Sequence, residues 1–449
     1  MNKLFLPLLA VLLGLMGCTD RNEPDAPALQ ARRTVLVYQA AQNSLGTQRY
    51  NQQDSTEMAN GIQYLKSDER LLLFIDDAQL PRLYEMRQGY AAPKLIKRWE
   101  TDLNSADPAT VTEVLRLVKT QFPSDDYGLV LWSHATGWVP SGKSVQNAQR
   151  NAAPTQGLTT PSTSALSTLA RPSTSPRPLT FGVDVGADGN MSRDLAALGA
   201  MPDEIGTAEL ANAIAASGLR PRYILFDCCL MQGVEAAYDL RNVTDYIAGS
   251  PMAIDASGGF YTDLMKTGLF SEDIRELGPS YMAAYEKQFT TPSTSDDFGA
   301  VFSIIRTDRL EPLAKVMAEV MPKALPSTID EAGFWRMDSV QAYAPYTATY
   351  FWRPEYYDLG DAMRRHLAPA DYARVKAELD QLVIYRGSTD VFWVGPGYYD
   401  YFSIDRQNYS GISMFVPQLR YTTNASRSIH GDLNEAYRKT AWSKAINKS

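Results

Sequence analysis

One histidine and two cysteines stand where their side chains could do covalent chemistry. The chain of 449 residues holds only three cysteines and three histidines. Cys228 and Cys229 come just after the apolar run 223–226, and His134 comes just after the run 129–132. A thiolate can attack a carbonyl carbon, an imidazole can hold or receive its proton, and backbone N–H groups can stabilise the oxyanion. These residue types indicate acyl transfer by a cysteine nucleophile with a histidine base.

The pattern alone does not choose between the two neighbouring cysteines. If the strand geometry continues, Cys228 and Cys229 point to opposite sides, one to the core and one to a cleft, and Asp227 shares a side with Cys229. Adjacent Cα atoms lie about 3.8 Å apart, below the usual disulfide range, so a bridge would be strained. The pair also lacks the two-residue spacer of redox motifs, which argues against a thiol oxidoreductase. His366 and His430 lie late in the chain and are weaker candidates.

The elements that would position these residues are short apolar strands. Such runs begin at residue 33 and recur at 71–75, 129–132, 223–226, 246–248 and 300–305, with helical spacing at 53–66 and 108–121. Apolar strands alternating with helices favour an α/β fold, a mostly parallel sheet covered on both faces. Such sheets place reactive groups beyond the carboxyl ends of their strands, where His134 and Cys229 stand.

The composition changes along the chain and suggests further boundaries. We predict a first domain over 33–308 and a C-terminal α+β region over 309–449, with a late strand at 412–416. Residues 332–360 and 392–403 are rich in aromatic side chains. We interpret them as core rather than as a sugar-type binding surface.

Residues 141–178 form a biased segment between His134 and Cys229. Ser, Thr and Pro fill 18 of its 38 positions, and it contains no aromatic and no acidic residue. Such a segment cannot bury enough apolar surface to order itself, so we predict a disordered insertion. Exposed segments of this kind attract proteolytic nicking, although an idle linker would have the same composition.

The N-terminus predicts export and lipid anchoring. A charged start and an apolar run over 1–17 describe a signal peptide too short to span a membrane. Leu-Met-Gly-Cys over 15–18 resembles a bacterial lipobox, in which Cys18 becomes the lipidated N-terminus. Residues 18–32 would be the tether, and the expected location is the bacterial cell envelope, at the outer membrane. The alternative is a plain signal peptide with an incidental cysteine.

Charge and missing motifs exclude other classes of protein. A formal net charge of −8 provides no basic field for nucleic acid. The chain has no GxGxxG after a strand, no GxxxxGK[ST], no GxSxG and no HExxH. With so few histidines and cysteines we expect no zinc site.

Two motifs resemble the clostripain family of cysteine peptidases, peptidase C11. Tyr-Gly-Leu-Val-Leu-Trp-Ser-His-Ala-Thr-Gly-Trp over 127–138 looks like the family strand that ends in His-Gly. Phe-Asp-Cys-Cys-Leu-Met over 226–231 looks like its Asp-Ala-Cys-Leu-Met, whose cysteine is the nucleophile. This register selects Cys229, and the resemblance covers roughly residues 33–305. It implies a caspase-like α/β/α sandwich and a cysteine endopeptidase acting on proteins or peptides after Arg or Lys.

The resemblance also implies roles for individual residues. The N–H groups of Ala135 and Cys229 would hold the oxyanion, and Asp227 with Asp255 would bind the basic P1 side chain, although Asp255 also suits a turn. The family is made as a zymogen and matures by a cut between its His and Cys. The basic residues of the insertion are therefore candidate processing sites: Lys143, Arg150, Arg171 and Arg177. Calcium dependence is implied by the family, but no dense carboxylate loop of the usual kind is visible.

Three departures from the family pattern leave an alternative open. Gln42 stands where the first strand normally carries Asp, Ala135 replaces a Gly, and Pro251 stands where some members have acidic residues. These differences motivate a second hypothesis, a catalytically inactive caspase-like surface lipoprotein that binds a peptide or a glycan.

Overall fold

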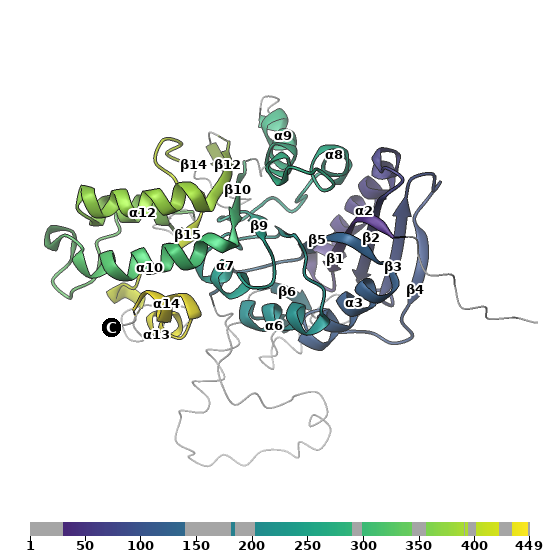
Figure 1. Ribbon diagram of the computed structural model, residues 1–449, viewed down its shortest axis with the longest axis horizontal. Helices are drawn as coiled ribbons and strands as arrows, with labels where there is room; N and C mark the ends of the chain where they lie inside the picture. The colour runs from purple at the N-terminus through teal and green to yellow at the C-terminus, as the bar shows by residue number, and fades with distance from the viewer. Residues whose placement is uncertain are drawn as a thin grey trace, which may run out of the picture.

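A nine-stranded sheet runs through the molecule, with helices on both of its faces (Figure 1). The structure is a computed structural model, and it describes residues 30–139, 181–184, 203–289, 299–343, 356–389, 391–393, 401–421 and 433–447. Across the sheet the strands lie in the order β12 (Val383–Ser388), β10 (Val301–Arg306), β9 (Tyr246–Gly249), β8 (Tyr223–Asp227), β5 (Ser124–Trp132), β1 (Ala31–Ala40), β2 (Glu69–Asp76), β3 (Arg82–Arg87) and β4 (Lys94–Arg98).

The middle of the sheet is parallel and its two margins are antiparallel. Strands β9, β8, β5, β1 and β2 all run the same way. β10 and β12 at one margin, and β3 and β4 at the other, are antiparallel additions. The parallel strands are buried on both faces, which explains why each reads as a continuous apolar run.

Two layers of helices complete the sandwich and confirm the predicted fold class. One face carries α2 (Tyr50–Gly61), α8 (Tyr261–Thr267) and α9 (Leu277–Phe289). The other face carries α3 (Pro108–Gln121), α6 (Thr207–Ser217) and α7 (Val234–Leu240). The two layers lie above and below the sheet in Figure 1.

Helix α3 shows how the sequence builds these layers. Asp107 caps its N-terminus by accepting the Ala109 N–H, and Pro108 occupies the first turn, where its missing N–H costs nothing. Its buried residues recur at helical spacing and make one apolar stripe: Val111, Val114, Leu115 and Val118.

The C-terminal region packs beyond β10 and also enters the sheet. Its helices are α10 (Leu310–Val320), α11 (Leu359–His366), α12 (Pro369–Leu382), α13 (Leu433–Arg438) and α14 (Ala441–Ile446). Two small two-stranded sheets pair β11 (Tyr357–Asp358) with β15 (Ser413–Met414), and β13 (Val391–Trp393) with β14 (Tyr401–Ser403). The late strand predicted over 412–416 is thus only two residues long.

The sheet continues across the predicted domain boundary near residue 308. β12 comes from the C-terminal region and pairs with β10 of the first domain, so one sheet runs across both parts. Of the aromatic residues in 332–360, Tyr343, Tyr356 and Tyr357 are buried, as expected for core. Within the described ranges, none of the helices has the length and apolar character needed to cross a bilayer.

Candidate active site

The register of two neighbouring parallel strands brings His134 and Cys229 to the same edge of the sheet. β5 and β8 pair so that Trp132 lies opposite Asp227. His134 and Cys229 each stand two residues beyond that pair. Paired strands lie about 4.8 Å apart, so the two residues leave the sheet side by side at the carboxyl ends of their strands.

The structure answers which cysteine faces outward. Cys228 is 1% exposed and belongs to the core under α3, α6 and α7. Cys229 is partly exposed. Leu230 then has φ +66°, a left-handed conformation that a leucine adopts only under constraint. The constraint is the loop after β9, where Met252 O accepts the Leu230 N–H at 2.9 Å.

The Cys229 thiol is held by backbone of the same loop. Its Sγ accepts the Ile254 N–H at 3.4 Å. Burial raises the pKa of the thiol, the Ile254 N–H opposes this rise, and Asp227 and Asp255 add to it, so that the net shift is upward. Cys229 is therefore a neutral thiol at pH 7 in this conformation.

His134 makes its contact on the side of β1. Its Nε2 lies 2.8 Å from Ser44 Oγ in the short helix α1 (Ser44–Thr47) that follows β1. Burial lowers the pKa of His134, so its ring is neutral at pH 7. The sequence analysis did not single out Ser44, because a lone serine after a strand carries no motif.

The loop that carries His134 is supported from the C-terminal region. Gly137 has φ +67°, and a Cβ there would stand 2.7 Å from Leu230 O, so the His and Cys loops touch. Tyr356 donates its hydroxyl hydrogen to Thr136 O at 2.5 Å. The ring of Trp138 packs edge-on against other aromatic rings from the end of the chain, Phe415 and Tyr437.

The same loop is paired with the far side of the insertion. β6 (Phe181–Asp184) returns beside it, where Phe181 bridges to Ala135 and Gly182 N donates to His134 O at 3.2 Å. Ala135 is 8% exposed and belongs to the core on the face of α3. Both ends of the segment 140–180 are thus fixed at the His134 loop.

Asp227 and Asp255 lie beneath and beside the thiol. Asp227 is buried and accepts hydrogen bonds from Gly259 N at 2.9 Å and from Tyr261 Oη at 2.7 Å. Burial raises the pKa of Asp227, and these donors partly oppose the shift. Asp255 is partly exposed and accepts the Ser257 N–H at 2.8 Å, which fits the turn that its sequence also suggested.

Two further carboxyl groups reach this cluster from α2 and were missed by sequence reasoning. Asp54 is 1% exposed, and neither carboxyl oxygen makes a short hydrogen bond in the described ranges. Burial, with Asp227 and Glu57 nearby, raises the pKa of Asp54 to about 9, while the nearby Trp132 side chain lowers it. Glu57 accepts the Tyr261 N–H at 2.8 Å. The only available signal was the spacing of Asp54 four residues before the buried Met58, which puts both on the inner face of α2.

These carboxyl groups have no cationic partner in the described part of the chain. No lysine or arginine there forms an ion pair with Asp54, Asp227 or Asp255. The described residues also contain no group of three or more His, Cys, Asp and Glu side chains placed to hold a metal ion, so they show no site that fits calcium.

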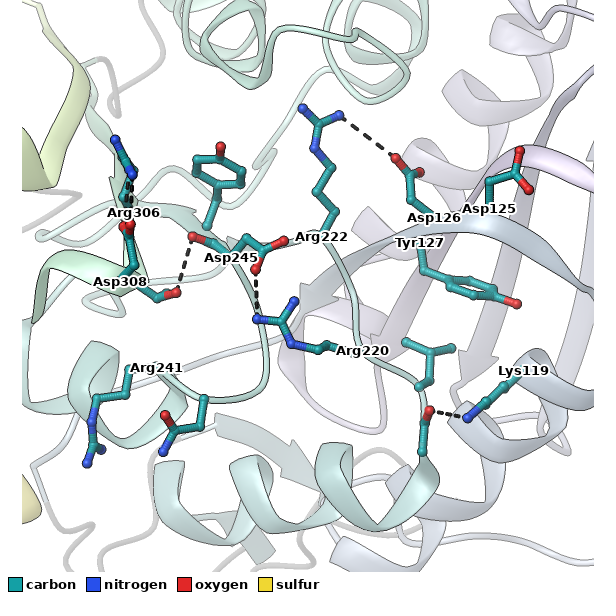
Figure 2. A pocket seen from close by; sticks show the side chains of 15 residues that line it. Lys119, Asp125, Asp126, Tyr127, Arg220, Arg222, Arg241, Asp245, Arg306 and Asp308 are labelled. Carbon is teal, nitrogen blue, oxygen red and sulfur yellow. Dashed lines mark hydrogen bonds and ion pairs between the residues drawn. The ribbon is translucent and has the colours of Figure 1, made fainter.

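A second charged cavity lies at the other edge of the sheet. It has a volume of about 800 Å³ and is lined where β5, β8 and β9 begin, by residues such as Tyr127, Arg222 and Tyr246. Figure 2 shows Arg220 turned toward Asp245, at 2.7 Å, and Arg222 and Arg306 turned toward Asp126 and Asp308. Arg241 pairs instead with Glu311, which does not line the cavity. With no Cys or His in its lining, this cavity is not a candidate for the predicted chemistry.

Several predicted site residues lie outside the described residues. These are Cys18, Lys143, Arg150, Arg171 and Arg177, together with His430. His366 is described and is buried, with Nδ1 2.7 Å from Ala362 O and Nε2 3.0 Å from Arg336 O. It serves the C-terminal region rather than the site.

Solved structures share this architecture. An X-ray structure of a secreted C11 cysteine protease from Bacteroides thetaiotaomicron, in complex with an irreversible peptide inhibitor, is 24% identical, with a TM-score of 0.69. An inactive zymogen C11 protease from Parabacteroides distasonis is 25% identical, with a TM-score of 0.67. Each alignment covers 93% of this chain and 99% of the other. No curated protein sequence matches the chain significantly.

The family comparison covers most of the chain and both sides of the insertion. The model of the clostripain family, Peptidase C11, matches residues 37–153 and 199–448. The first range holds His134 and the second holds Cys229. The chain therefore belongs to the clostripain family of cysteine peptidases.

Proposed function

We propose that this protein is an active endopeptidase in which Cys229 is the nucleophile and His134 its proton carrier. The observation that carries the proposal is the equal register of the two residues beyond β5 and β8, with Cys229 rather than Cys228 facing outward. The substrates would be exported proteins or peptides.

Each group then has a defined step in acyl transfer. Cys229 passes its proton to His134 and its sulfur attacks the scissile carbonyl carbon, forming a C–S bond. The N–H groups of Cys229 and Ala135 hold the resulting oxyanion. His134 gives the proton to the departing amine, which leaves a thioester. Water then adds with His134 as base, and the thiol is released.

The acidic cluster supports a preference for Arg or Lys at P1. Asp227 lies two residues before the nucleophile, and Asp54 adds a buried carboxyl group in its field. Neither has a cationic partner among the described residues, and burial raises the pKa of both, which disfavours their charged forms. A guanidinium or ammonium group from the substrate would supply the missing positive charge, with Asp255 at the more exposed side.

The anchoring of the insertion supports activation by cleavage between residues 140 and 180. The segment leaves the His134 loop after Val139 and returns at Phe181, which bridges to Ala135. A cut there would free the backbone beside the proton carrier. Lys143, Arg150, Arg171 and Arg177 match the proposed specificity, so self-cleavage is part of the proposal.

We also propose an envelope location with a lipid on Cys18. The signal-like run over 1–17 and the polar tether over 18–32 support it. Two or more signals are usually needed for stable lipid anchoring, which diacylation of an N-terminal cysteine would satisfy. Metabolic labelling with a fatty-acid probe should label the natural chain, and Cys18→Ala should remove the label.

The central test uses residues 33–449 and the variant Cys229→Ala. We expect the unaltered protein to hydrolyse fluorogenic peptides that end in Arg or Lys, to react with an Arg-directed thiol inhibitor, and to cut itself within 140–180. Cys228→Ala should keep most of this activity. If the unaltered protein hydrolyses no peptide and reacts with no such inhibitor, the inactive binding lipoprotein becomes the better hypothesis.

A further inference from the structure

Ser44 and Cys229 follow the two strands that flank the strand of His134. In the sheet, β5 lies between β1 and β8. The turn after β1 carries Ser44, whose Oγ lies 2.8 Å from His134 Nε2, and the turn after β8 carries Cys229. The two ring nitrogens of an imidazole point away from each other. With Nε2 engaged on the β1 side, Nδ1 is the nitrogen left for a partner on the side of β8.

The contact between Ser44 and His134 is braced by a buried contact just behind it. Asn43 Nδ2 donates to Ser133 Oγ at 3.3 Å, and both Asn43 Nδ2 and Ser133 Oγ donate to Ala40 O at 2.8 Å. Asn43 and Ser133 directly precede Ser44 and His134, so two parallel hydrogen bonds join the turns after β1 and β5. The link holds the imidazole at a fixed place relative to the sheet.

The turn that presents Ser44 is also fixed by its own backbone. Asn43 caps α1 by accepting the Leu45 N–H at 3.0 Å, and Thr47 N donates to Asn43 O at 3.0 Å. Gly46 closes the turn so tightly against Ala41 that any Cβ at position 46 would overlap its carbonyl oxygen. The hydroxyl of Ser44 is therefore held in place, although the residue lies at the surface.

We propose that Ser44 is a positioning residue for the catalytic histidine. Its hydroxyl oxygen accepts the Nε2–H of His134, which selects the tautomer whose Nδ1 lone pair can take the proton of Cys229. When His134 becomes an imidazolium, both nitrogens are donors, and Ser44 keeps Nε2 satisfied while Nδ1 faces the sulfur. The inference rests on the proposed function, since it assigns Ser44 to the same Cys229–His134 pair.

The kinetic test compares Ser44→Ala and Ser44→Thr with a matched control. Ser124→Ala is that control, because Ser124 Oγ donates to Ala31 O at 3.0 Å at the opposite end of β5. We expect Ser44→Ala to lower kcat about tenfold, the effect of one lost hydrogen bond in the transition state, with KM changed less than twofold. Ser44→Thr should restore most of kcat, and Ser124→Ala should leave it unchanged.

A spectroscopic test separates this inference from the proposed activity. In the Cys229→Ala background, the ¹⁵N shifts of His134, assigned with a His134→Gln variant, report its tautomer and pKa without turnover. We expect the Nε2–H tautomer, and a lower His134 pKa in Ser44→Ala because the imidazolium loses an acceptor. The tautomer should also become mixed in that variant.

The outcomes distinguish the two ideas. Unchanged kcat and unchanged ¹⁵N shifts in Ser44→Ala would overturn the positioning role while leaving the peptidase intact. Faster self-cleavage in Ser44→Ala would also overturn it, since the contact would then restrain His134 rather than serve it. If the unaltered protein has no activity, the proposed function fails, and the ¹⁵N shifts alone decide whether Ser44 sets the tautomer.

Discussion

At the scale of single residues, the thiol and the imidazole are both shifted toward their neutral forms. Burial raises the pKa of Cys229 and lowers that of His134, so each charged form is disfavoured before substrate arrives. A thiolate–imidazolium pair would need the two groups to face each other, with the carboxylates of Asp227 and Asp255 compensated. In the continuous chain described here, the thiol of Cys229 and the imidazole of His134 are therefore both held in their neutral forms.

Alkylation of the uncleaved chain tests this state. With residues 33–449 kept intact, we expect iodoacetamide to modify Cys229 slowly at pH 7, at a rate that still rises through pH 9, because only the thiolate reacts. The rate is read by mass spectrometry of the peptide that carries the thiol. Cys228 is buried and should stay unmodified in the native protein, which Cys229→Ala checks directly. A plateau reached by pH 7 would contradict the raised pKa.

Asp54 makes stability depend on pH with a definite sign. Its pKa is about 9 in the folded protein and about 3.9 in an unfolded chain, so folding takes up a proton between those values. The resulting cost is absent below about pH 4 and grows as pH rises toward 9, to about 7 kcal/mol in full. We expect Asp54→Asn to gain in Tm relative to the unaltered protein as pH rises from 5 to 8.

Thermal melts at several pH values measure that difference. Asp338→Asn provides the matched control, because Asp338 is an exposed aspartate. A difference in Tm between Asp54→Asn and the unaltered protein that stays constant across this range would mean that Asp54 is not the titrating group. The same variant should lose activity on Arg- and Lys-ending peptides if Asp54 contributes to the P1 pocket.

At the scale of elements, the loop that carries His134 contacts the loop that carries Cys229 at Gly137. Gly137 has φ +67°, and a Cβ there would meet Leu230 O at 2.7 Å, immediately after the left-handed turn at Leu230. Gly89 has φ +85° with nothing within 4 Å of its would-be Cβ. The two positions share the conformational cost of a side chain and differ only in the contact.

Alanine substitutions at these two glycines separate the two costs. Gly89→Ala should lower the free energy of unfolding by about 1 kcal/mol, the cost of a positive φ. Gly137→Ala should cost about 2–3 kcal/mol because the backbone must also shift, and it should lower peptidase activity. Denaturant melts and peptide hydrolysis read the two effects. Equal losses of stability with unchanged activity would show that the loops do not depend on this contact.

Much of the sheet was predictable from sequence, and the remainder depends on distant contacts. The central strands are buried on both faces, so their apolar runs stand out. The strand ends indicated His134 and the pair Cys228 and Cys229, and only the resemblance to the family selected Cys229. β4 is largely exposed and carries Lys and Arg, so it gives no such signal. β12 has the partly buried pattern of many segments, and only its pairing with β10 identifies it as a strand of the sheet. The places of Asp54 and Ser44 beside the site could not be predicted, because they depend on how α2 and the turn after β1 pack against neighbouring strands.

At the scale of the whole molecule, the strand order follows the position of the insertion. Every strand that precedes residue 140 lies on one side of the β5–β8 pair, and every strand of the sheet that follows residue 180 lies on the other. Helices cross this line, since α2 packs on α8 and α3 packs on α6. A cut in the insertion therefore leaves two pieces that stay joined by the β5–β8 pair, by these two helix contacts and by the contacts of the His134 loop with Phe181, Tyr356 and Phe415.

The cleaved protein should remain assembled. We expect the fragments to co-elute in size-exclusion chromatography at native pH and to separate only in denaturing gels, because parting them would expose the paired edges of β5 and β8 and the apolar faces of four helices. Cleavage at an inserted site for an unrelated protease, in the Cys229→Ala background, supplies the same species without self-processing. Two peaks in the native column would contradict this expectation.

The division of the sheet between the two fragments separates His134 from Cys229 along the chain. After the cut, His134 and Cys229 belong to separate polypeptides, so neither piece contains a complete reacting pair. Hydrolysis then becomes a property of their pairing, as in a split enzyme whose halves are made from two genes. A two-fragment complementation assay could therefore be built from this protein by dividing it at the boundary between β5 and β8.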